Sequence, residues 1–143
     1  MKYKDLLSCV VGALTSAIMW LYGGVSASMG CLMICMAVDY ILGLLVAGVF
    51  KKSKKTESGR LNSMEGWKGL CKKGCILMIV AVGYRLDMML NTVYIRDALI
   101  TGYIVNEIIS ITENCGLMGV PMPKAVKNAI DVLNRKINEN DLD

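Results

Sequence analysis

The sequence of 143 residues contains no histidine and only two prolines. Histidine is the commonest general acid–base group and a frequent metal ligand, so its absence removes the usual centre of many enzymes. The sequence also lacks a glycine-rich phosphate loop and a nucleophile placed beside a base. We therefore expect no enzyme, and we predict neither a cofactor nor a metal site.

Charged residues are scarce as well, at 20%, whereas 55% of the residues are hydrophobic and the mean hydropathy is +0.49. A soluble protein of this size needs a more polar surface than this composition supplies. The apolar residues fall in long blocks, without the rhythm of an amphipathic helix. Such blocks are typical of helices that face lipid on all sides. The length of the whole chain is enough for one domain.

The six cysteines do not indicate a disulfide framework. Cys9, Cys31, Cys35 and Cys75 lie within apolar runs, where a thiol acts as a small packing residue in a bilayer or a reducing cell. Pairs four residues apart, such as Cys31 and Cys35, would face a soft metal together. A structural metal site requires about four ligands, however, so we do not predict one here.

Four apolar segments predict an all-α membrane bundle of about four transmembrane helices, at residues 6–21, 29–50, 70–90 and 97–114. The second is long enough to cross a hydrocarbon core of about 30 Å. The first follows two lysines and also has the form of a secretory signal peptide. The last two contain charged residues, so a buried hairpin or a surface location remains an alternative to crossing.

A basic loop at residues 51–69 separates the second and third segments. The basic residues of this loop and of the start of the third helix are Lys51, Lys52, Lys54, Lys55, Arg60, Lys68, Lys72 and Lys73. Basic loops beside membrane segments mark the cytoplasmic side, so we expect a multi-pass protein of the cytoplasmic membrane with both termini in the cytoplasm. Nucleic-acid binding is the other interpretation of such a run, and we do not predict it.

Pro121 and Pro123 separate the membrane domain, residues 1–120, from a C-terminal region at residues 121–143. In that region Val126, Ile130, Leu133 and Ile137 recur at helical spacing. The pattern predicts a short cytoplasmic amphipathic helix, followed by a polar tail. The apolar face of this helix would dock on the bundle, on the membrane surface or on a second copy.

Asp39 lies in the middle of the second apolar segment. It shares a stripe of small residues, each four positions apart, with Cys31, Cys35, Gly43 and Ala47. Small residues at this spacing let membrane helices approach closely, so Asp39 should face protein. A charge at the bilayer centre costs about 2.5–3.5 kcal/mol on insertion scales. Arg85 and Glu107 fall at a similar predicted depth, which predicts that Arg85 bridges the two acids or that all three line water between subunits.

Further polar residues belong to the third and fourth segments. Asp87 lies close to Arg85, and one face of the fourth segment contains Asn106, Glu107, Ser110, Glu113 and Asn114. A polar stripe on a membrane helix has two interpretations, hydrogen bonding between helices or the lining of an aqueous path. The sequence alone leaves both open.

Several stretches together resemble a known family: "VDYILGLLVAG", "SMEGWKGLCKKG" and above all "YIVNEIISITENCGLMGVPMPKAVKNAI". The chain resembles the phage-lysis and toxin-secretion holins of Gram-positive phages and clostridia, over roughly residues 39–133. The residues that match the family pattern are Asp39, Gly43, Ser63, Gly66, Gly69, Lys73, Asp87, Glu107, Ser110, Glu113, Asn114, Gly119, Pro121 and Pro123. Arg85 is not among them.

The resemblance implies a protein that oligomerises in the cytoplasmic membrane of the bacterial host and forms lesions. These lesions release an endolysin or a toxin, without the need for direct contact with that protein, and so lead to lysis. The implied partners are the bilayer and further copies of the chain. A small oligomeric ion channel or transporter, or an antiholin-type membrane scaffold, remains the alternative.

Overall fold

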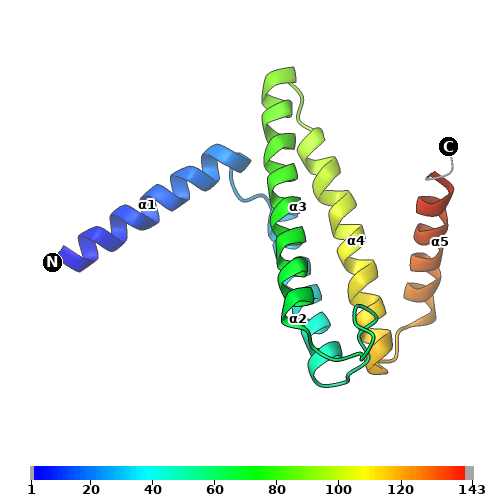
Figure 1. Ribbon diagram of the computed structural model, residues 1–143. Coiled ribbons are helices and arrows are strands. Elements are labelled where there is room, and N and C mark those ends of the chain that lie inside the picture. The colour runs from blue at the N-terminus through cyan, green and yellow to red at the C-terminus, as the bar shows by residue number, and fades with distance from the viewer. Residues whose placement is uncertain (1, 141–143) are drawn as a thin grey trace.

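The structure is a computed structural model that describes residues 2–140, and within that range it contains five α-helices and no strand (Figure 1). The helices are α1 (Lys2–Tyr22), α2 (Ala27–Gly48), α3 (Ser63–Leu90), α4 (Ile95–Met118) and α5 (Lys124–Asn140). The predicted all-α class is confirmed. Two helices, α1 and α2, are long and apolar enough by hydropathy to cross a membrane, so crossing by α3 and α4 stays a prediction.

Helices α2, α3 and α4 form a bundle in which α4 packs mainly against α2 and also against α3 (Figure 1). Helices α2 and α4 run in the same direction, and α3 runs antiparallel to both. The α2–α3 loop, residues 49–62, therefore lies at the same end of the bundle as the end of α4. The short turn at residues 91–94 lies at the opposite end. We call the two ends of the bundle the loop side and the turn side.

Local hydrogen bonds fix where α2 and α3 begin. The hydroxyl of Ser26 accepts from the amide of Met29 at 3.2 Å, and Asn62 Oδ1 accepts from the amide of Met64 at 3.0 Å. Both are N-caps, which satisfy amides that have no partner within the helix. The cap at Asn62 starts α3 at Ser63 instead of about residue 70, so Lys72 and Lys73 belong to a helix and not to the loop.

An apolar core fills the turn side of the bundle. It consists of the buried side chains Met29, Leu32, Met36, Val80 and Ile100, which come from all three helices. At the same end, a Cβ added to Gly83 would lie 2.5 Å from Leu99 Cδ1 and 3.4 Å from Arg96 Cα. Only glycine at this position lets α3 and α4 approach so closely.

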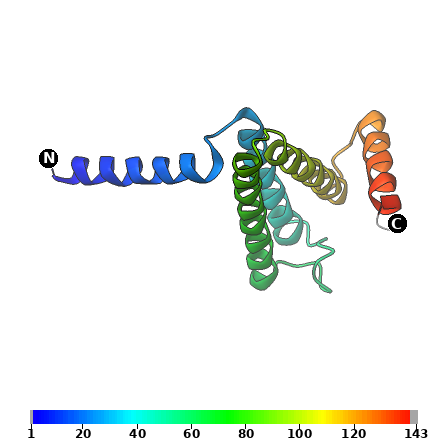
Figure 2. The ribbon, with the colours of Figure 1, turned by 90° about the horizontal axis from the view of Figure 1, so that it is seen from above.

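Helix α1 projects away from the bundle, and all of its described side chains except Tyr22 are exposed (Figure 2). Only its C-terminal end is attached. Arg85 on α3 donates to the carbonyl of Trp20 at 2.6 Å, and its guanidinium lies 3.6 Å from the centre of the Trp20 ring. Arg96 on α4 donates to the carbonyl of Tyr22 at 2.7 Å. The two cations thus meet the unpaired carbonyls and partial negative charge of a helix C-terminus.

Helix α5 stands beside the bundle on the side of α4, after a break at residues 119–123 (Figures 1 and 2). Gly119, at φ +81°, ends α4 in the left-handed conformation that glycine adopts readily. Ile130 of the predicted apolar face is buried and Val126 is half-buried. Leu133 and Ile137 lie in the helix, as the spacing predicted.

Candidate functional site

A buried ion cluster joins α2, α3 and α4 on the loop side of the apolar core. The ammonium of Lys73 lies 2.9 Å from Asp39 Oδ2 and 2.5 Å from Glu107 Oε2. Each helix contributes one of the three charges. The side chains of Lys73, Asp39 and Glu107 are 13%, 11% and 4% exposed. The ion cluster therefore fixes the relative rotation of all three helices.

One ammonium faces two carboxylates, so the ion cluster has an excess of one negative charge if all three groups are ionised. Asn114 on α4 donates to the second oxygen of Asp39 at 3.1 Å. Every buried side-chain nitrogen and oxygen in the described part of the chain has a hydrogen-bond partner. Hydrogen bonding of this kind is what allows charges to be buried at all, because an unpaired one is costly.

The predicted role of Arg85 as the bridging cation is wrong. Arg85 lies on the turn side, where it contacts Trp20, whereas Lys73 occupies the predicted bridging position. At about 1.5 Å per residue, these two positions on α3 are roughly 18 Å apart. The prediction measured depth from Gly74, but α3 begins at Ser63. Arg85 is therefore close to the end of the helix instead of its middle.

The sequence contains a signal for Lys73 that depth alone does not reveal. Gly66, Gly69 and Lys73 recur at intervals of three and four residues, so they lie on one face of α3. A Cβ added to Gly66 would lie 3.7 Å from the hydroxyl oxygen of Tyr40, and one added to Gly69 would lie 3.9 Å from its ring. The two glycines thus bring α3 against α2 on the stripe that positions the lysine.

The predicted stripe of small residues on α2 faces α4 at its loop-side half. Asp39 and Ala47 are buried, and Gly43 is half-buried with the Asn114 amide 4.0 Å from the site of an added Cβ. Cys31, at the other end of the predicted stripe, is exposed. Cys35, one turn further along, is half-buried. The stripe is therefore most buried beside the polar residues of the loop side.

A cavity of about 310 Å³ lies between α2, α3, α4 and the α2–α3 loop, next to the ion cluster. It is large enough to hold several water molecules. The five predicted polar residues of α4 all line it: Asn106, Glu107, Ser110, Glu113 and Asn114. Glu107 is buried, whereas Asn106 and Glu113 are exposed. The polar stripe thus combines hydrogen bonding between helices with the lining of a cavity.

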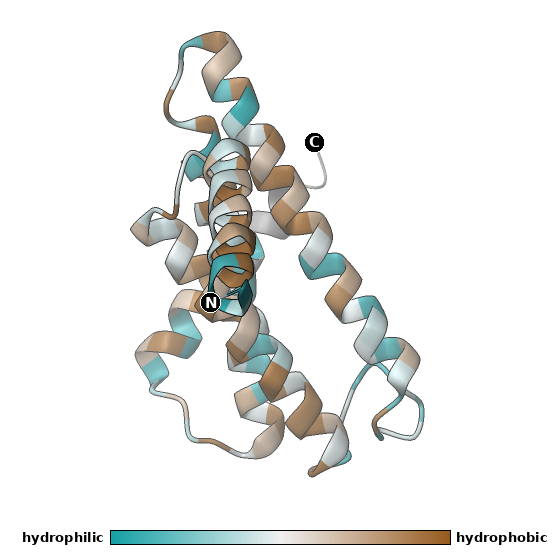
Figure 3. Cartoon of the chain, turned by 90° about the vertical axis from the view of Figure 1, so that its left-hand side faces the viewer, coloured by the Kyte–Doolittle hydropathy of each residue, from teal (hydrophilic) through white to brown (hydrophobic). Residues whose placement is uncertain are grey.

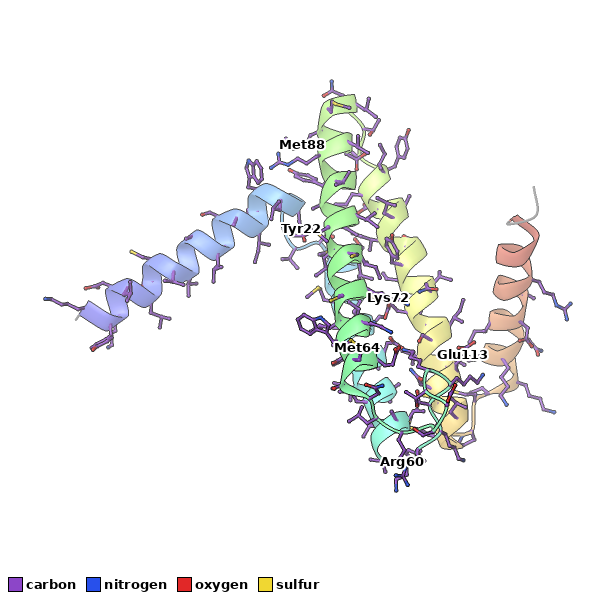
Figure 4. The ribbon with its side chains drawn as sticks, in the orientation of Figure 1. Tyr22, Arg60, Met64, Lys72, Met88 and Glu113 are labelled. Atoms are coloured by element: carbon purple, nitrogen blue, oxygen red, sulfur yellow. The ribbon has the colours of Figure 1, made fainter. Side chains whose placement is uncertain are left out.

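The basic loop closes the outer end of this cavity. Hydrophilic residues make up much of the α2–α3 loop, in contrast to the more apolar helices (Figure 3). Lys54 and Lys55 line the cavity together with Lys72 and Lys73 of α3, whereas Lys51 and Lys52 do not belong to the lining. Figure 4 shows Lys72 on the side of α3 that faces α4, above Glu113.

Asp87, near the end of α3, caps the start of α4. Its Oδ1 accepts from the Thr92 hydroxyl at 2.6 Å and from the amide of Ile95 at 3.0 Å, and its Oδ2 accepts from the amide of Arg96 at 2.8 Å. A carboxylate at this place satisfies free amides and the positive end of the helix dipole. Asp87 therefore fixes the turn of the α3–α4 hairpin and lies on the turn side, away from the ion cluster.

No group of three potential metal ligands occurs among the residues that the structure describes. The predicted polar and packing residues of the helices lie in two separate places in the bundle. Asp39, Gly43, Ala47, Lys73, Asn106, Glu107, Ser110, Glu113 and Asn114 gather at the loop-side cavity, and Arg85 and Asp87 lie at the turn side.

Comparisons with known proteins point to one protein family. The sequence matches the bacteriophage holin family over residues 16–135. It is 37% identical to an uncharacterized protein of Halalkalibacterium halodurans over 136 residues, which cover 91% of this chain and 95% of the relative. It is 35% identical to an uncharacterized 14.9 kDa protein of Clostridium perfringens over 82% of this chain and 84% of the relative.

A relative with a named role is the "Probable holin" of Bacillus phage phi105. It is 33% identical over 98 residues, which cover 67% of this chain and 66% of that protein. No solved structure matches the chain. Because the family match spans the bundle, the ion cluster and most of α5, the chain belongs to the bacteriophage holin family.

Proposed function

We propose that this protein is a holin, which assembles in the bacterial cytoplasmic membrane into lesions that let a cytoplasmic endolysin, or a toxin, leave the cell. Membership of the holin family over residues 16–135 carries this proposal. The buried ion cluster beside a polar cavity gives it a physical basis, because it supplies polar surface that can line water once the bundle rearranges.

In the proposed topology α1 to α4 all cross the membrane, with the α2–α3 loop and both termini in the cytoplasm. The loop has five basic residues and one acidic residue, and the loop side also holds the end of α4. The turn at residues 91–94 has no charged residue. This asymmetry is the one that the positive-inside rule requires.

In the proposed mechanism, the ion cluster is sealed within each subunit while the protein is dilute. As subunits accumulate, the polar face of α4 re-pairs between copies or becomes hydrated, and an aqueous lesion opens. A charge exposed to lipid costs several kcal/mol, so partly rearranged intermediates are unfavourable. The change from the sealed to the open state is therefore cooperative. The excess carboxylate of the ion cluster favours the hydrated state.

Release of a folded enzyme tests the function directly. The chain is expressed in bacteria together with a cytoplasmic endolysin, and culture density, membrane potential and extracellular endolysin are followed. A holin gives abrupt loss of potential followed by escape of the endolysin. Loss of potential with the endolysin retained would instead identify a small channel, for which the polar cavity is the favouring feature. No effect on either would indicate an antiholin-type scaffold.

Lysis timing tests the mechanism separately from the function. Glu107→Gln leaves one ammonium with one carboxylate, which lowers the cost of the sealed state, so we expect delayed lysis. The matched control is Glu113→Gln, on the same helix and the same cavity but exposed. Unchanged timing in Glu107→Gln would contradict the charge mechanism, while endolysin release by the natural chain would still support the holin proposal.

Labelling of single cysteines from outside the cell tests the topology. Val25 and Val93 are 71% and 85% exposed and lie in the two turns that the proposal places outside. Val25→Cys and Val93→Cys, each in a background without the natural cysteines, should both react with an impermeant reagent. Reaction at position 25 alone would leave a two-span protein whose second half rests on the membrane surface.

A further inference from the structure

The α2–α3 loop, which closes the outer end of the cavity, has a defined conformation that its own hydrogen bonds stabilise. The amide of Ser53 donates to the carbonyl of Gly59 at 3.0 Å, and the Thr56 hydroxyl donates to the carbonyl of Arg60 at 2.9 Å. Gly59 adopts φ +68°, and a Cβ there would collide with the carbonyl of Lys51. These contacts hold the α2–α3 loop in one shape over the cavity.

Three lysines at this outer end have no ion pair among the residues that the structure describes. Lys54 and Lys55 come from the loop and Lys72 comes from α3, and all three line the cavity. The described salt bridges of the bundle lie elsewhere, at Lys68–Glu65, at the ion cluster and at Arg96–Asp97. The inner carboxylates Asp39 and Glu107 both pair with Lys73, deeper in the cavity, and leave one negative charge there.

The nearest other carboxylate, Glu65, does not balance these lysines. Lys68 hydrogen bonds to it at 2.7 Å, and the charges of Lys72 and Lys55 also act on it. One carboxylate therefore faces three nearby ammonium groups. Glu113 is the remaining acid of the lining, and Arg60, the other basic residue there, points away from the bundle (Figure 4). The outer end of the cavity keeps an excess of positive charge.

The position of this charge along the bundle indicates what neutralises it. Helix α2 has 22 residues, about the length of a hydrocarbon core, and ends at Gly48, directly before the basic loop. If α2 crosses the bilayer, the loop lies at the level of the lipid headgroups on the cytoplasmic side, where anionic lipids attract lysines. The hydroxyl of Ser53 and the side-chain amide of Asn62 line the same end of the cavity and can donate hydrogen bonds.

We propose that the outer end of the cavity, formed by Lys54, Lys55 and Lys72, binds the phosphate group of an anionic phospholipid. The phosphate would receive charge-assisted hydrogen bonds from the lysines, and the acyl chains would lie along the outer surface of the bundle. Bound lipid would hold the loop against α3 and α4 and keep the cavity closed from the cytoplasm. This inference rests on α2 crossing the membrane and does not depend on the holin activity.

The test compares two pairs of lysines in the same loop. The full chain is purified in a neutral detergent and titrated with phosphatidylglycerol, phosphatidylcholine and inorganic phosphate, and bound lipid is counted by native mass spectrometry. One variant is Lys54→Gln with Lys55→Gln, in the cavity lining. Its matched control is Lys51→Gln with Lys52→Gln, which removes the same charge outside the lining. Lys72→Gln removes a lysine of the site from a helix, so it leaves the loop sequence intact.

We expect the natural chain and the control to bind phosphatidylglycerol with similar affinity and in preference to phosphatidylcholine. Affinity should fall by about tenfold or more in the Lys54/Lys55 variant, and by a smaller factor in Lys72→Gln. Equal losses in the two pairs would mean diffuse attraction to a polybasic loop and would overturn the site. Binding of inorganic phosphate as tight as that of the lipid would overturn the lipid as its ligand, as would unchanged affinity in Lys72→Gln together with the Lys54/Lys55 variant.

Discussion

The turn-side and loop-side halves of the bundle are held together in opposite ways. On the turn side, Leu32, Val80 and Ile100 are fully buried and α3 meets α4 at Gly83 without a gap. On the loop side, the same three helices enclose a cavity and are joined by Lys73, Asp39 and Glu107. The turn-side half is therefore stabilised by close packing of apolar side chains, and the loop-side half by ion pairs.

This difference indicates which half is able to change. Packed apolar side chains in a membrane lose contacts when helices separate and gain nothing from water. Charges lose their partners too, but water or another subunit can replace those partners. The loop-side half is therefore the better candidate for opening, with the turn-side half as the part that keeps the three helices together.

Of the substitutions considered, removal of Lys73 should destabilise the bundle most, through its loop-side half. Lys73→Met leaves Asp39 and Glu107 buried without a cation, which is expected to destabilise the bundle by about 3–5 kcal/mol. Thermal unfolding in detergent, followed by circular dichroism, measures the loss. Lys68→Met is the control, because that lysine is 58% exposed and its ion pair in the described part of the chain is with Glu65. Equal stability of the two variants would show that charge does not hold this half.

Truncation of Leu32 should weaken the turn-side half by a smaller amount. Leu32→Ala opens a hole in a fully buried position and should cost at least about 2 kcal/mol. Ile34→Ala, on the same helix at a side chain that is 67% exposed, should leave the unfolding temperature nearly unchanged. If the two halves act as described, Leu32→Ala lowers stability without the change in lysis timing that Glu107→Gln produces.

Loss of the Asp87 cap should loosen only one end of the turn-side half. Asp87→Ala removes the acceptor of the Ile95 and Arg96 amides. Hydrogen exchange at the first turn of α4 should become about tenfold faster, while exchange near Ile100 changes less. Asp97→Ala, at the exposed acid of the same turn, is the comparison. Faster exchange throughout α4 would contradict a local role for Asp87.

Release of α1 should have the smallest effect on the bundle. Arg85→Gln removes the guanidinium from the Trp20 ring and carbonyl, at a site outside the core and the ion cluster. Spin labels at Ser8→Cys and Met78→Cys, in a background without the natural cysteines, should give a broader distance distribution, with bundle stability almost unchanged. Arg60→Gln is the control. An unchanged distribution would mean that Arg85 does not hold α1.

Much of the helical framework follows from local patterns. Blocks of apolar residues located α1 and α2, and the prolines and the spacing of Val126 and Ile130 located α5. The burial of Asp39 also followed from its small neighbours Gly43 and Ala47. Hydropathy missed the first turns of α3, because Lys72 and Lys73 lower it at positions that already belong to the helix.

The sequence by itself determined that the chain is helical and apolar, that Asp39 and Glu107 need a partner, and that basic residues gather between α2 and α3. These properties depend on periodicity, hydropathy and the cost of a buried charge, which are local. Tertiary structure alone decided that Lys73 and not Arg85 is the partner, and that the polar face of α4 borders a cavity. Both depend on where each helix begins and how it is rotated against its neighbours, which is fixed by contacts between residues far apart in the chain.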